Sequence, residues 1–222
     1  DSYILCTVRE NTYAVGCYNV ELTKANYDKF PSTKLTGMLV QGWDSIISML
    51  KKKMDARKVL AVDLYTGVYE EEVLDAFSKE FSGRVMNVRD LMKPEKEIQT
   101  LTERFMTEDV LFGYVTNLKL EDYLDADKVA AARKQIGEAK ETIVIIGTGA
   151  AVVAPQDAMV VYADMARWEI QQRFRRHEVK ALGIDNRNDA VSLQYKRGYF
   201  NDWRVCDRYK ERLFDRVEFW ID

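Results

Sequence analysis

The sequence predicts an α/β protein, in which helices cover both faces of a mostly parallel sheet to give three layers. Three short apolar runs, at 58–63, 142–146 and 159–163, have the composition of strands that are buried on both faces. Amphipathic helical patterns follow the first and the last of these runs, at 70–80 and 165–177. Because buried strands that alternate with helices are typical of parallel sheets, these patterns indicate the fold class.

The composition is that of a globular chain with a proper core. Of the 222 residues, 47% are hydrophobic and 31% are charged, which fits one large domain or one domain with a small appendage. No apolar run approaches the roughly 18 residues that a membrane helix needs, and the N-terminus has no basic-then-apolar signal pattern. We therefore expect no association with a membrane.

Few residues of the chain are suited to bind a transition metal. Cys6, Cys17 and Cys206 are odd in number and lack C-x-x-C spacing, which argues against a disulfide framework and favours a reducing cytoplasm. His177 is the only histidine, so a metal site would depend on carboxylates. We expect no metal site and no histidine-based catalytic triad.

The net charge of −3 conceals a division between the two halves of the chain. Residues 60–130 contain 16 acids and 8 bases, whereas residues 162–222 contain 13 bases and 11 acids. A bound anion is therefore expected towards the C-terminal half. The overall balance is far from that of a general nucleic-acid-binding protein, so no nucleic-acid partner is expected.

We expect residues 1–42 to form a small appendage to the domain at 43–222. Apolar residues at 3–8 and 15–22 predict the two strands of an N-terminal hairpin, followed by a polar and aromatic loop at 26–31. A helix is predicted within 42–53, with Asp44 as its cap.

A further strand is predicted at 84–88, after the helix at 70–80. A helical insertion is expected between this strand and the one at 142–146, at about 94–140. It contains predicted helices at 94–104 and 121–138, joined through a short strand or loop at 109–115. Gly147 and Gly149 follow the strand at 142–146, but they lack the remainder of a dinucleotide-binding fingerprint, so close packing is the favoured interpretation. Asp164 is predicted to cap the arginine-rich helix at 165–177.

Three aspartates follow or end predicted strands and are the candidate catalytic residues. Asp63, Asp90 and Asp164 are at positions where doubly wound sheets carry functional side chains, and they could bind Mg²⁺ or act as bases. The alternative interpretation, helix caps and loop anchors, is favoured for all three.

The segment 59–71 resembles the opening strand and phosphate-binding loop of uridine-kinase-like P-loop kinases. Residues 64–71 fall where those kinases carry G-x-x-x-x-G-K-[ST], and the internal Gly67 is kept. Leu64 and Tyr69 replace the two motif glycines, Glu70 replaces the lysine and Glu71 the hydroxyl residue. The resemblance implies a nucleoside-kinase-like fold with a degenerate phosphate loop. Kinase activity is not expected, because glutamates would repel a triphosphate; ATP with Mg²⁺ is therefore disfavoured as a cofactor.

Three longer segments resemble an N-terminal, kinase-like region of bacterial class I mannose-6-phosphate isomerase-like proteins. They are NYDKFP at 26–31, YADMARWEIQ at 162–171 and YKRGYFNDWRVCDR at 195–208. In that architecture a cupin domain holds the zinc that isomerises the sugar phosphate, and His177 alone cannot supply its ligands. The resemblance implies carbohydrate metabolism, with an adjoining cupin domain as partner.

Three functional hypotheses follow. The first is a catalytically inactive kinase-like domain that binds a sugar phosphate or a nucleotide. Its anion ligands would be the basic residues near the aromatic C-terminal segment, namely Arg167, Lys196, Arg197, Arg204 and Arg208.

The second hypothesis is an active enzyme, either a kinase with an unusual loop or part of a sugar-phosphate isomerase. The third is a structural module in which exposed Trp203, Tyr209 and Trp220 dock a partner domain or a second copy, and in which 217–221 is a strand or a dock for another domain.

Overall fold

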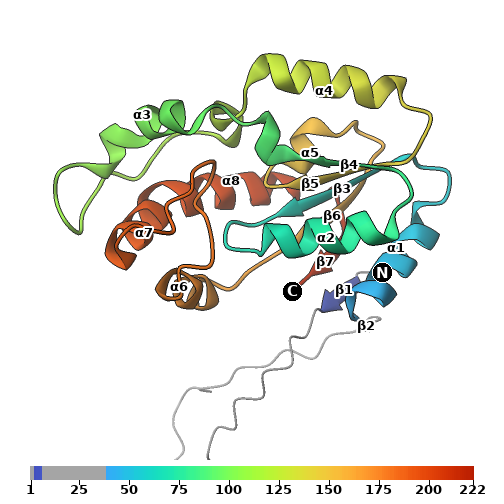
Figure 1. Cartoon of the computed structure of the whole chain (residues 1–222), viewed down its shortest axis with the longest axis horizontal. Coiled ribbons are helices and arrows are strands. Elements are labelled where there is room, and N and C mark those ends of the chain that lie inside the picture. Colours follow the sequence, from blue (N-terminus) through green and yellow to red (C-terminus); the bar gives the residue numbers. More distant parts are fainter. Residues whose placement is uncertain (1–2, 7–38) are drawn as a thin grey trace, which may run out of the picture.

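The computed structural model describes residues 3–6 and 39–222, which fold around one seven-stranded sheet (Figure 1). All strand pairings in it are parallel, and the order is β2-β1-β7-β6-β3-β5-β4. The strands are β1 (Tyr3–Cys6), β2 (Leu39–Gln41), β3 (Val59–Leu64), β4 (Arg84–Asn87), β5 (Ile143–Gly147), β6 (Met159–Ala163) and β7 (Val217–Ile221).

Helices cover both faces of this sheet, which confirms the predicted three-layer α/β arrangement. The α-helices are α1 (Trp43–Met54), α2 (Glu70–Glu80), α3 (Glu95–Met106), α4 (Ala126–Glu138), α5 (Ala150–Val153), α6 (Arg167–Arg175), α7 (Val191–Arg197) and α8 (Trp203–Leu213). Two 3₁₀-helices, η1 (Val88–Leu91) and η2 (Leu120–Tyr123), and a π-helix, η3 (Gly198–Asp202), complete the elements.

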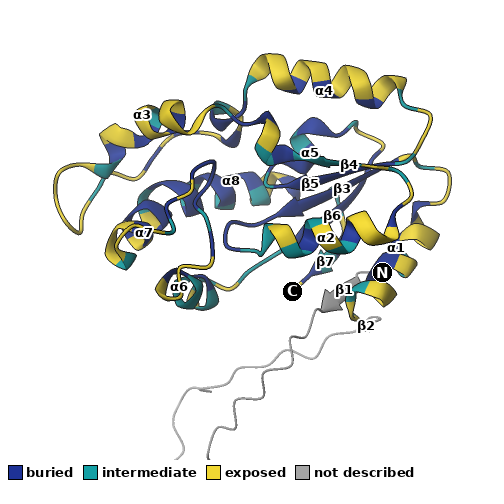
Figure 2. Ribbon diagram, viewed as in Figure 1, coloured by how far each residue is buried: buried dark blue, intermediate teal, exposed yellow. Residues whose placement is uncertain are grey.

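The central strands are buried along their whole length because both of their faces are covered. Every residue of β3, β5 and β6 is buried (Figure 2). On one face, α1 and α2 pack against even-numbered β3 residues such as Leu60 and Val62. On the other face, Val59 and Ala61 lie in a second cluster with side chains of α3, α4, α5 and α8. This two-sided burial explains why the strands are apolar runs without alternation.

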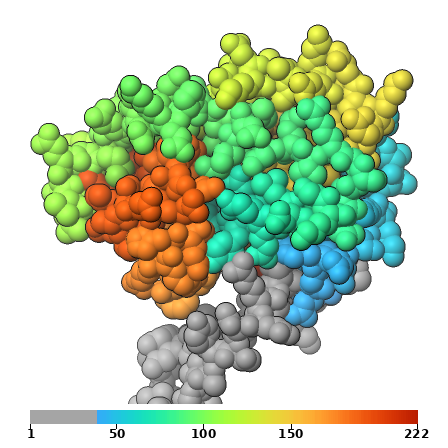
Figure 3. All heavy atoms as spheres, viewed as in Figure 1, coloured from blue at the N-terminus to red at the C-terminus, as the bar shows by residue number. Residues whose placement is uncertain are grey.

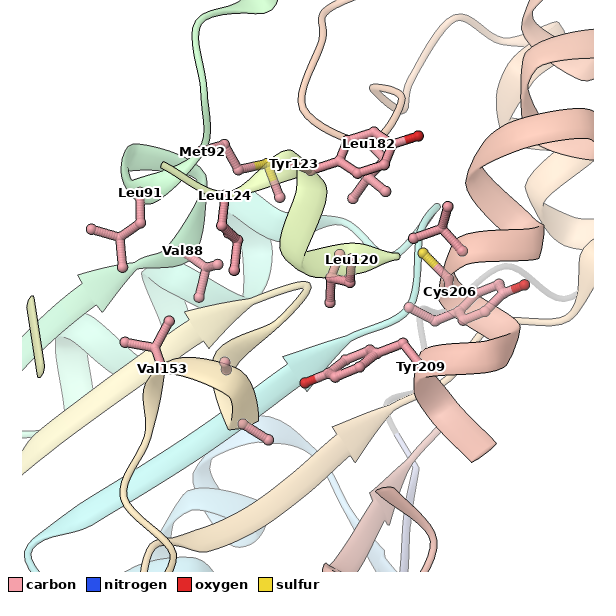
Figure 4. Close-up of a cluster of buried hydrophobic side chains, with 14 of the residues drawn as sticks. Val88, Leu91, Met92, Leu120, Tyr123, Leu124, Val153, Leu182, Cys206 and Tyr209 are labelled. Carbon is pink, nitrogen blue, oxygen red and sulfur yellow. The ribbon is translucent and has the colours of Figure 1, made fainter. Parts of the chain in front are cut away.

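The helical insertion lies between β4 and β5, as predicted, but its second helix starts later than the pattern indicated. α4 begins at Ala126 because the Asp125 carboxylate accepts the backbone N–H groups of Asp127 (3.0 Å) and Lys128 (3.1 Å). The preceding residues form η2, whose apolar side chains pack beside η1 and α8 (Figure 4). Residues 109–115 form no strand.

Two predicted helix caps are wrong. α6 begins at Arg167, and Asp164 accepts instead the N–H of Met165 and a hydrogen bond from Lys210 (2.8 Å). Asp44 lies inside the first turn of α1, whose cap position is Gly42. There its negative charge suits the helix dipole without capping a backbone group.

The C-terminal aromatic segment is mostly interior, which corrects the prediction that Trp203 and Tyr209 are exposed. α8 is amphipathic and directs Trp203, Cys206 and Tyr209 into the core, since positions three apart share a helix face. Trp220 on β7 is half-buried beside Tyr162, with ring centroids 5.2 Å apart. Residues 217–221 are a strand inside the sheet.

The first strand of the chain extends the main sheet. β1 pairs in parallel with β2 and with β7, with Ile4 beside Leu39 and Trp220. The predicted second hairpin strand at 15–22 and the loop at 26–31 lie outside the described residues.

Candidate functional site

The strand order places a crevice at the carboxyl end of β3. From β3 the chain proceeds to β4 and β5 on one side of the sheet and then crosses to β6 and β7 on the other. Ligands of open parallel sheets bind outside the carboxyl ends of the strands at such a reversal. The candidate site is therefore the place where the segments after β3, β5 and β6 meet.

The segment after β3 forms a tight turn, and side chains of the protein pack closely against it. Leu64 and Tyr65 are buried, and the Tyr65 hydroxyl donates a hydrogen bond to Asp207 (2.7 Å). Gly67 has φ +95°, and a Cβ there would lie 2.8 Å from Cγ1 of Ile170 on α6. The turn is thus packed against α6, with Tyr65 directed into the core.

An arginine of α6 clamps this turn. Arg173 Nη1 donates to the Gly67 carbonyl oxygen (2.7 Å), and its guanidinium lies 3.7 Å from the centroid of the Tyr69 ring. The Tyr69 hydroxyl donates to the Glu178 carboxylate. The backbone carbonyl and the aromatic ring of the turn are therefore both held by charged residues of the α6 region.

Two of the three glutamates at the start of α2 form ion pairs with basic residues of other segments. Glu70 Oε2 lies 3.0 Å from Arg89 Nε, and Glu71 Oε1 accepts from Lys180 Nζ at 2.6 Å. The hydrogen bond from Lys180 lowers the pKa of Glu71. The cavity that Thr66 lines together with Glu70, Arg89 and Lys180 has a volume of about 30 Å³. This is room for one or two water molecules and not for a phosphate group.

The predicted catalytic aspartates do not converge. Asp63 is fully buried, where its carboxylate accepts the N–H groups of Gly149 (3.0 Å) and Ala151 (2.9 Å) and the Tyr209 hydroxyl (2.5 Å). Figure 4 shows the Tyr209 hydroxyl directed at β3. Burial raises the pKa of Asp63 to about 6.

Asp90 and Asp164 are on different parts of the surface. Asp90 is exposed at the end of η1, beyond the edge strand β4, and half-buried Asp164 follows β6. These strands are three positions apart in the sheet, which corresponds to about 14 Å. The three carboxylates are therefore not placed to share one metal ion.

Each of the five predicted anion ligands donates at least one hydrogen bond to a group of its own chain. Lys196 binds the carbonyl oxygens of Thr107 and Asp109, and Arg208 binds those of Thr116 and Leu118. These contacts anchor the segment that follows α3. Ligand binding by these basic residues stays a prediction.

The other three have local partners as well. Arg197 donates to the Thr102 hydroxyl, and Arg204 donates to the Tyr199 carbonyl oxygen. Arg167 pairs with Asp207. Arg167 borders a hollow of about 280 Å³ at the carboxyl ends of the strands, together with Asp164 and Lys210.

A larger pocket at the same edge was not foreseen from the sequence. It has a volume of about 390 Å³ and an apolar floor that includes Val68, Val73 and Ile221. It also borders Asp164, so it adjoins the hollow beside Arg167. Its residues come from α1, α2, β6, α6 and β7, so no single motif could reveal it. We call it the edge pocket.

The rim of the edge pocket is acidic. Five carboxylates line it against two guanidinium groups, Arg173 and Arg176. Both arginines pair with Glu169, and Arg176 also pairs with Glu178 (2.9 Å). The Trp43 indole N–H donates to Glu72 (3.1 Å). The edge pocket thus offers apolar surface, one indole and an excess of hydrogen-bond acceptors.

A larger cavity among the described residues lies at the amino ends of the strands, opposite the edge pocket. It has a volume of about 1490 Å³ and opens between α4 and the amino ends of β3 and β5. Two of its arginines are bound to backbone carbonyl oxygens, Arg133 to Val152 and Arg216 to Ala151. We place the functional site at the other edge, because parallel sheets bind ligands at the carboxyl ends of their strands.

Residues 39–222 contain no cluster of three or more metal-binding side chains, and no described helix is long and apolar enough to cross a bilayer. The family of sequences described as "Domain of unknown function (DUF8485)" matches residues 42–222. The chain belongs to this family.

No curated protein matches this DUF8485 domain. Among solved structures, a gluconokinase from Sinorhizobium meliloti 1021 is 11% identical to it, with a TM-score of 0.39. The alignment covers 73% of this chain and 80% of the gluconokinase. A likeness of this extent says nothing about what the DUF8485 domain binds.

Proposed function

We propose that this DUF8485 domain is a kinase-like domain that binds a sugar or sugar phosphate without transferring a phosphoryl group. The observation that supports this most is the pairing of Glu70 with Arg89 and of Glu71 with Lys180. The chain's own carboxylates neutralise the cations that lie where a phosphate-binding loop would hold a nucleotide.

Phosphoryl transfer requires cations at the developing charge. A catalytic phosphate loop brings a lysine to the β- and γ-phosphates, and its hydroxyl side chain helps to hold Mg²⁺. Glu70 and Glu71 stand at those two motif positions, and the cavity beside them is about 30 Å³. Both the charge and the space therefore argue against bound ATP.

The edge pocket is the proposed ligand site. Its volume of about 390 Å³ is in the range of small-molecule sites, and its carboxylates are suited to accept hydrogen bonds from hydroxyl groups. Its acidic excess repels a triphosphate more than a monophosphate, because repulsion grows with the ligand's charge. Arg176 is the more exposed of its two cations and would face a single phosphate.

The resemblance to mannose-6-phosphate isomerase-like proteins selects the first ligand to test. Isothermal titration of the full chain with mannose 6-phosphate, mannose, ATP, UTP and uridine would compare the ligand classes. We expect heat with the sugar or sugar phosphate and none with ATP. Arg176→Gln should weaken binding of mannose 6-phosphate about tenfold and leave mannose binding unchanged, since the proposed contact of Arg176 with the ligand is to the phosphate.

A matched variant and an activity assay complete the test. Arg212→Gln changes an arginine that pairs with Glu121 at the opposite edge, and it should bind like the original chain. ATP hydrolysis stimulated by a sugar would contradict the proposal. So would heat with ATP but not with the sugars.

A further inference from the structure

Exposed apolar side chains gather at one end of the described molecule. Eleven large hydrophobic residues are exposed among residues 39–222, and nine of them belong to the segment after α3 or to α6, α7 and η3. Their exposed fractions run from 38% to 70%. We call these nine residues the end face: Val110, Leu111, Phe112, Tyr114, Val115, Trp168, Leu193, Tyr195 and Tyr199.

The two parts of the end face form one continuous surface. Lys196 Nζ donates to the Thr107 carbonyl oxygen (3.3 Å), and Thr116 N donates to that of Phe200 (2.9 Å). Leu111 lines a hollow of about 380 Å³ together with α6 and α7 residues that include Phe174 and Tyr195. In Figure 3 the green segment near residue 110 borders the orange region of α6 and α7.

Hydrogen bonds hold the exposed segment in place. The Asp109 carboxylate accepts the N–H groups of Leu111 and Phe112, both at 2.7 Å. The Thr107 hydroxyl donates to the Phe112 carbonyl oxygen (2.6 Å), and Tyr114 N donates to Phe105 O (2.8 Å). The apolar side chains are therefore presented in a fixed arrangement, which lowers the ordering cost of binding a partner.

The exposed area is large enough for a specific interface. Taking roughly 200 Å² for each aromatic side chain, the exposed fractions of the five rings amount to roughly 570 Å², and the four aliphatic residues add to this. A standard interface buries about 800 Å² per partner, and a face of this size exceeds the scattered apolar exposure of ordinary surfaces.

We propose that the end face joins two copies of this chain in a two-fold symmetric dimer. A projecting apolar segment lies beside an apolar hollow, so a two-fold axis can place the Phe112 segment of each copy in the hollow of the other. The charges of the projecting segment and of the hollow are also complementary. Exposed Glu108 precedes the projecting segment, and exposed Arg175 lines the hollow.

Sedimentation of the full chain over a concentration series tests the dimer. The original chain is expected to dimerise, and Phe112→Ser should weaken the dimer about tenfold or more because it removes a central aromatic contact. Trp168→Ser should do the same from a different element, and it decides the question if the first variant does not fold. Phe214→Ser removes an aromatic side chain that is 55% exposed outside the end face and should leave the dimer unchanged.

A charge exchange tests the geometry. Arg175→Glu should weaken the dimer by like-charge repulsion against Glu108, and adding Glu108→Arg should restore it. Finding only monomers at every concentration would overturn the proposal, and the end face would then be a candidate surface for binding a different protein. A dimer that neither Phe112→Ser nor Trp168→Ser weakens would overturn it as well. Neither result bears on sugar binding, since the end face and the edge pocket share no residue.

Discussion

Asp63 shows how one residue can look catalytic in a sequence and be structural in the fold. It lies near the end of a central strand, where parallel sheets carry functional groups. In the structure, two backbone N–H groups and the Tyr209 hydroxyl surround its carboxylate, and the side chain is fully buried. These contacts tie β3 to the turn after β5 and to α8, so Asp63 connects three elements.

Asp63 should make stability depend on pH. Burial raises its pKa from 3.8 to about 6, so the folded state disfavours the charged form relative to the unfolded state. The stability that Asp63 contributes is fully present below about pH 4 and is lost as pH rises through about 6. The full difference is ~3 kcal/mol, at 1.36 kcal/mol for each pKa unit.

Urea unfolding between pH 4 and pH 7 of the original chain and of Asp63→Asn would measure this. The free energy of unfolding of the original chain should fall relative to that of the variant as pH rises. Asp90→Asn changes an exposed aspartate and should keep the profile of the original chain. Parallel profiles for the original chain and Asp63→Asn would show that burial does not disfavour the Asp63 carboxylate.

At the scale of elements, the π-helix η3 separates Arg197, which the sequence suggested as an anion ligand, from the buried acid with which it pairs. Arg197 immediately precedes η3 and Asp202 ends it, and both side chains are buried with Arg197 Nε 3.6 Å from Asp202 Oδ1. The other oxygen of Asp202 accepts the N–H of Leu182 (3.1 Å). The wider turn of a π-helix shifts the side chains that follow it relative to those that precede it.

Asp202→Ala should destabilise the fold by about 3–5 kcal/mol, because it leaves the buried Arg197 guanidinium without a counter-charge. Replacing both partners, with Arg197→Met and Asp202→Leu, should recover most of this loss. Asp185→Ala breaks the exposed pair with Arg187 and should cost less than about 1 kcal/mol. Chemical unfolding measures all three variants. A loss for Asp202→Ala as small as that for Asp185→Ala would mean that water already solvates Arg197.

At the scale of the whole molecule, the strands that are buried on both faces could be predicted from the sequence, and features that depend on contacts between distant segments could not. β3, β5 and β6 were foreseen because strands covered on both faces are mostly apolar. The strand order and the edge pocket depend on contacts between distant segments, which leave no local pattern. Interleaved bases and aromatics at 195–208 suggested a binding surface. The orientation of these side chains could not be predicted, because composition alone does not show that Trp203 points inward and that Lys196 binds carbonyl oxygens.

The predicted division of the chain into an appendage at 1–42 and a domain at 43–222 can be tested with a fragment. The described buried residues of both apolar clusters all follow position 42, and from β2 only partly buried Val40 packs against them, so residues 43–222 should fold without β1 and β2. Their removal would expose the edge of β7, where Phe219, Trp220 and Ile221 pair with β1. Taking about 1 kcal/mol for each lost hydrogen bond, we expect the fragment to be less stable by about 3 kcal/mol and more prone to aggregate.

Circular dichroism and light scattering of the fragment beside the full chain would separate the outcomes. A cooperative thermal transition at a lower temperature, with added scattering, is the result expected for a self-sufficient domain with an uncovered edge. A fragment without a cooperative transition would mean that residues 1–42 belong to the folding unit.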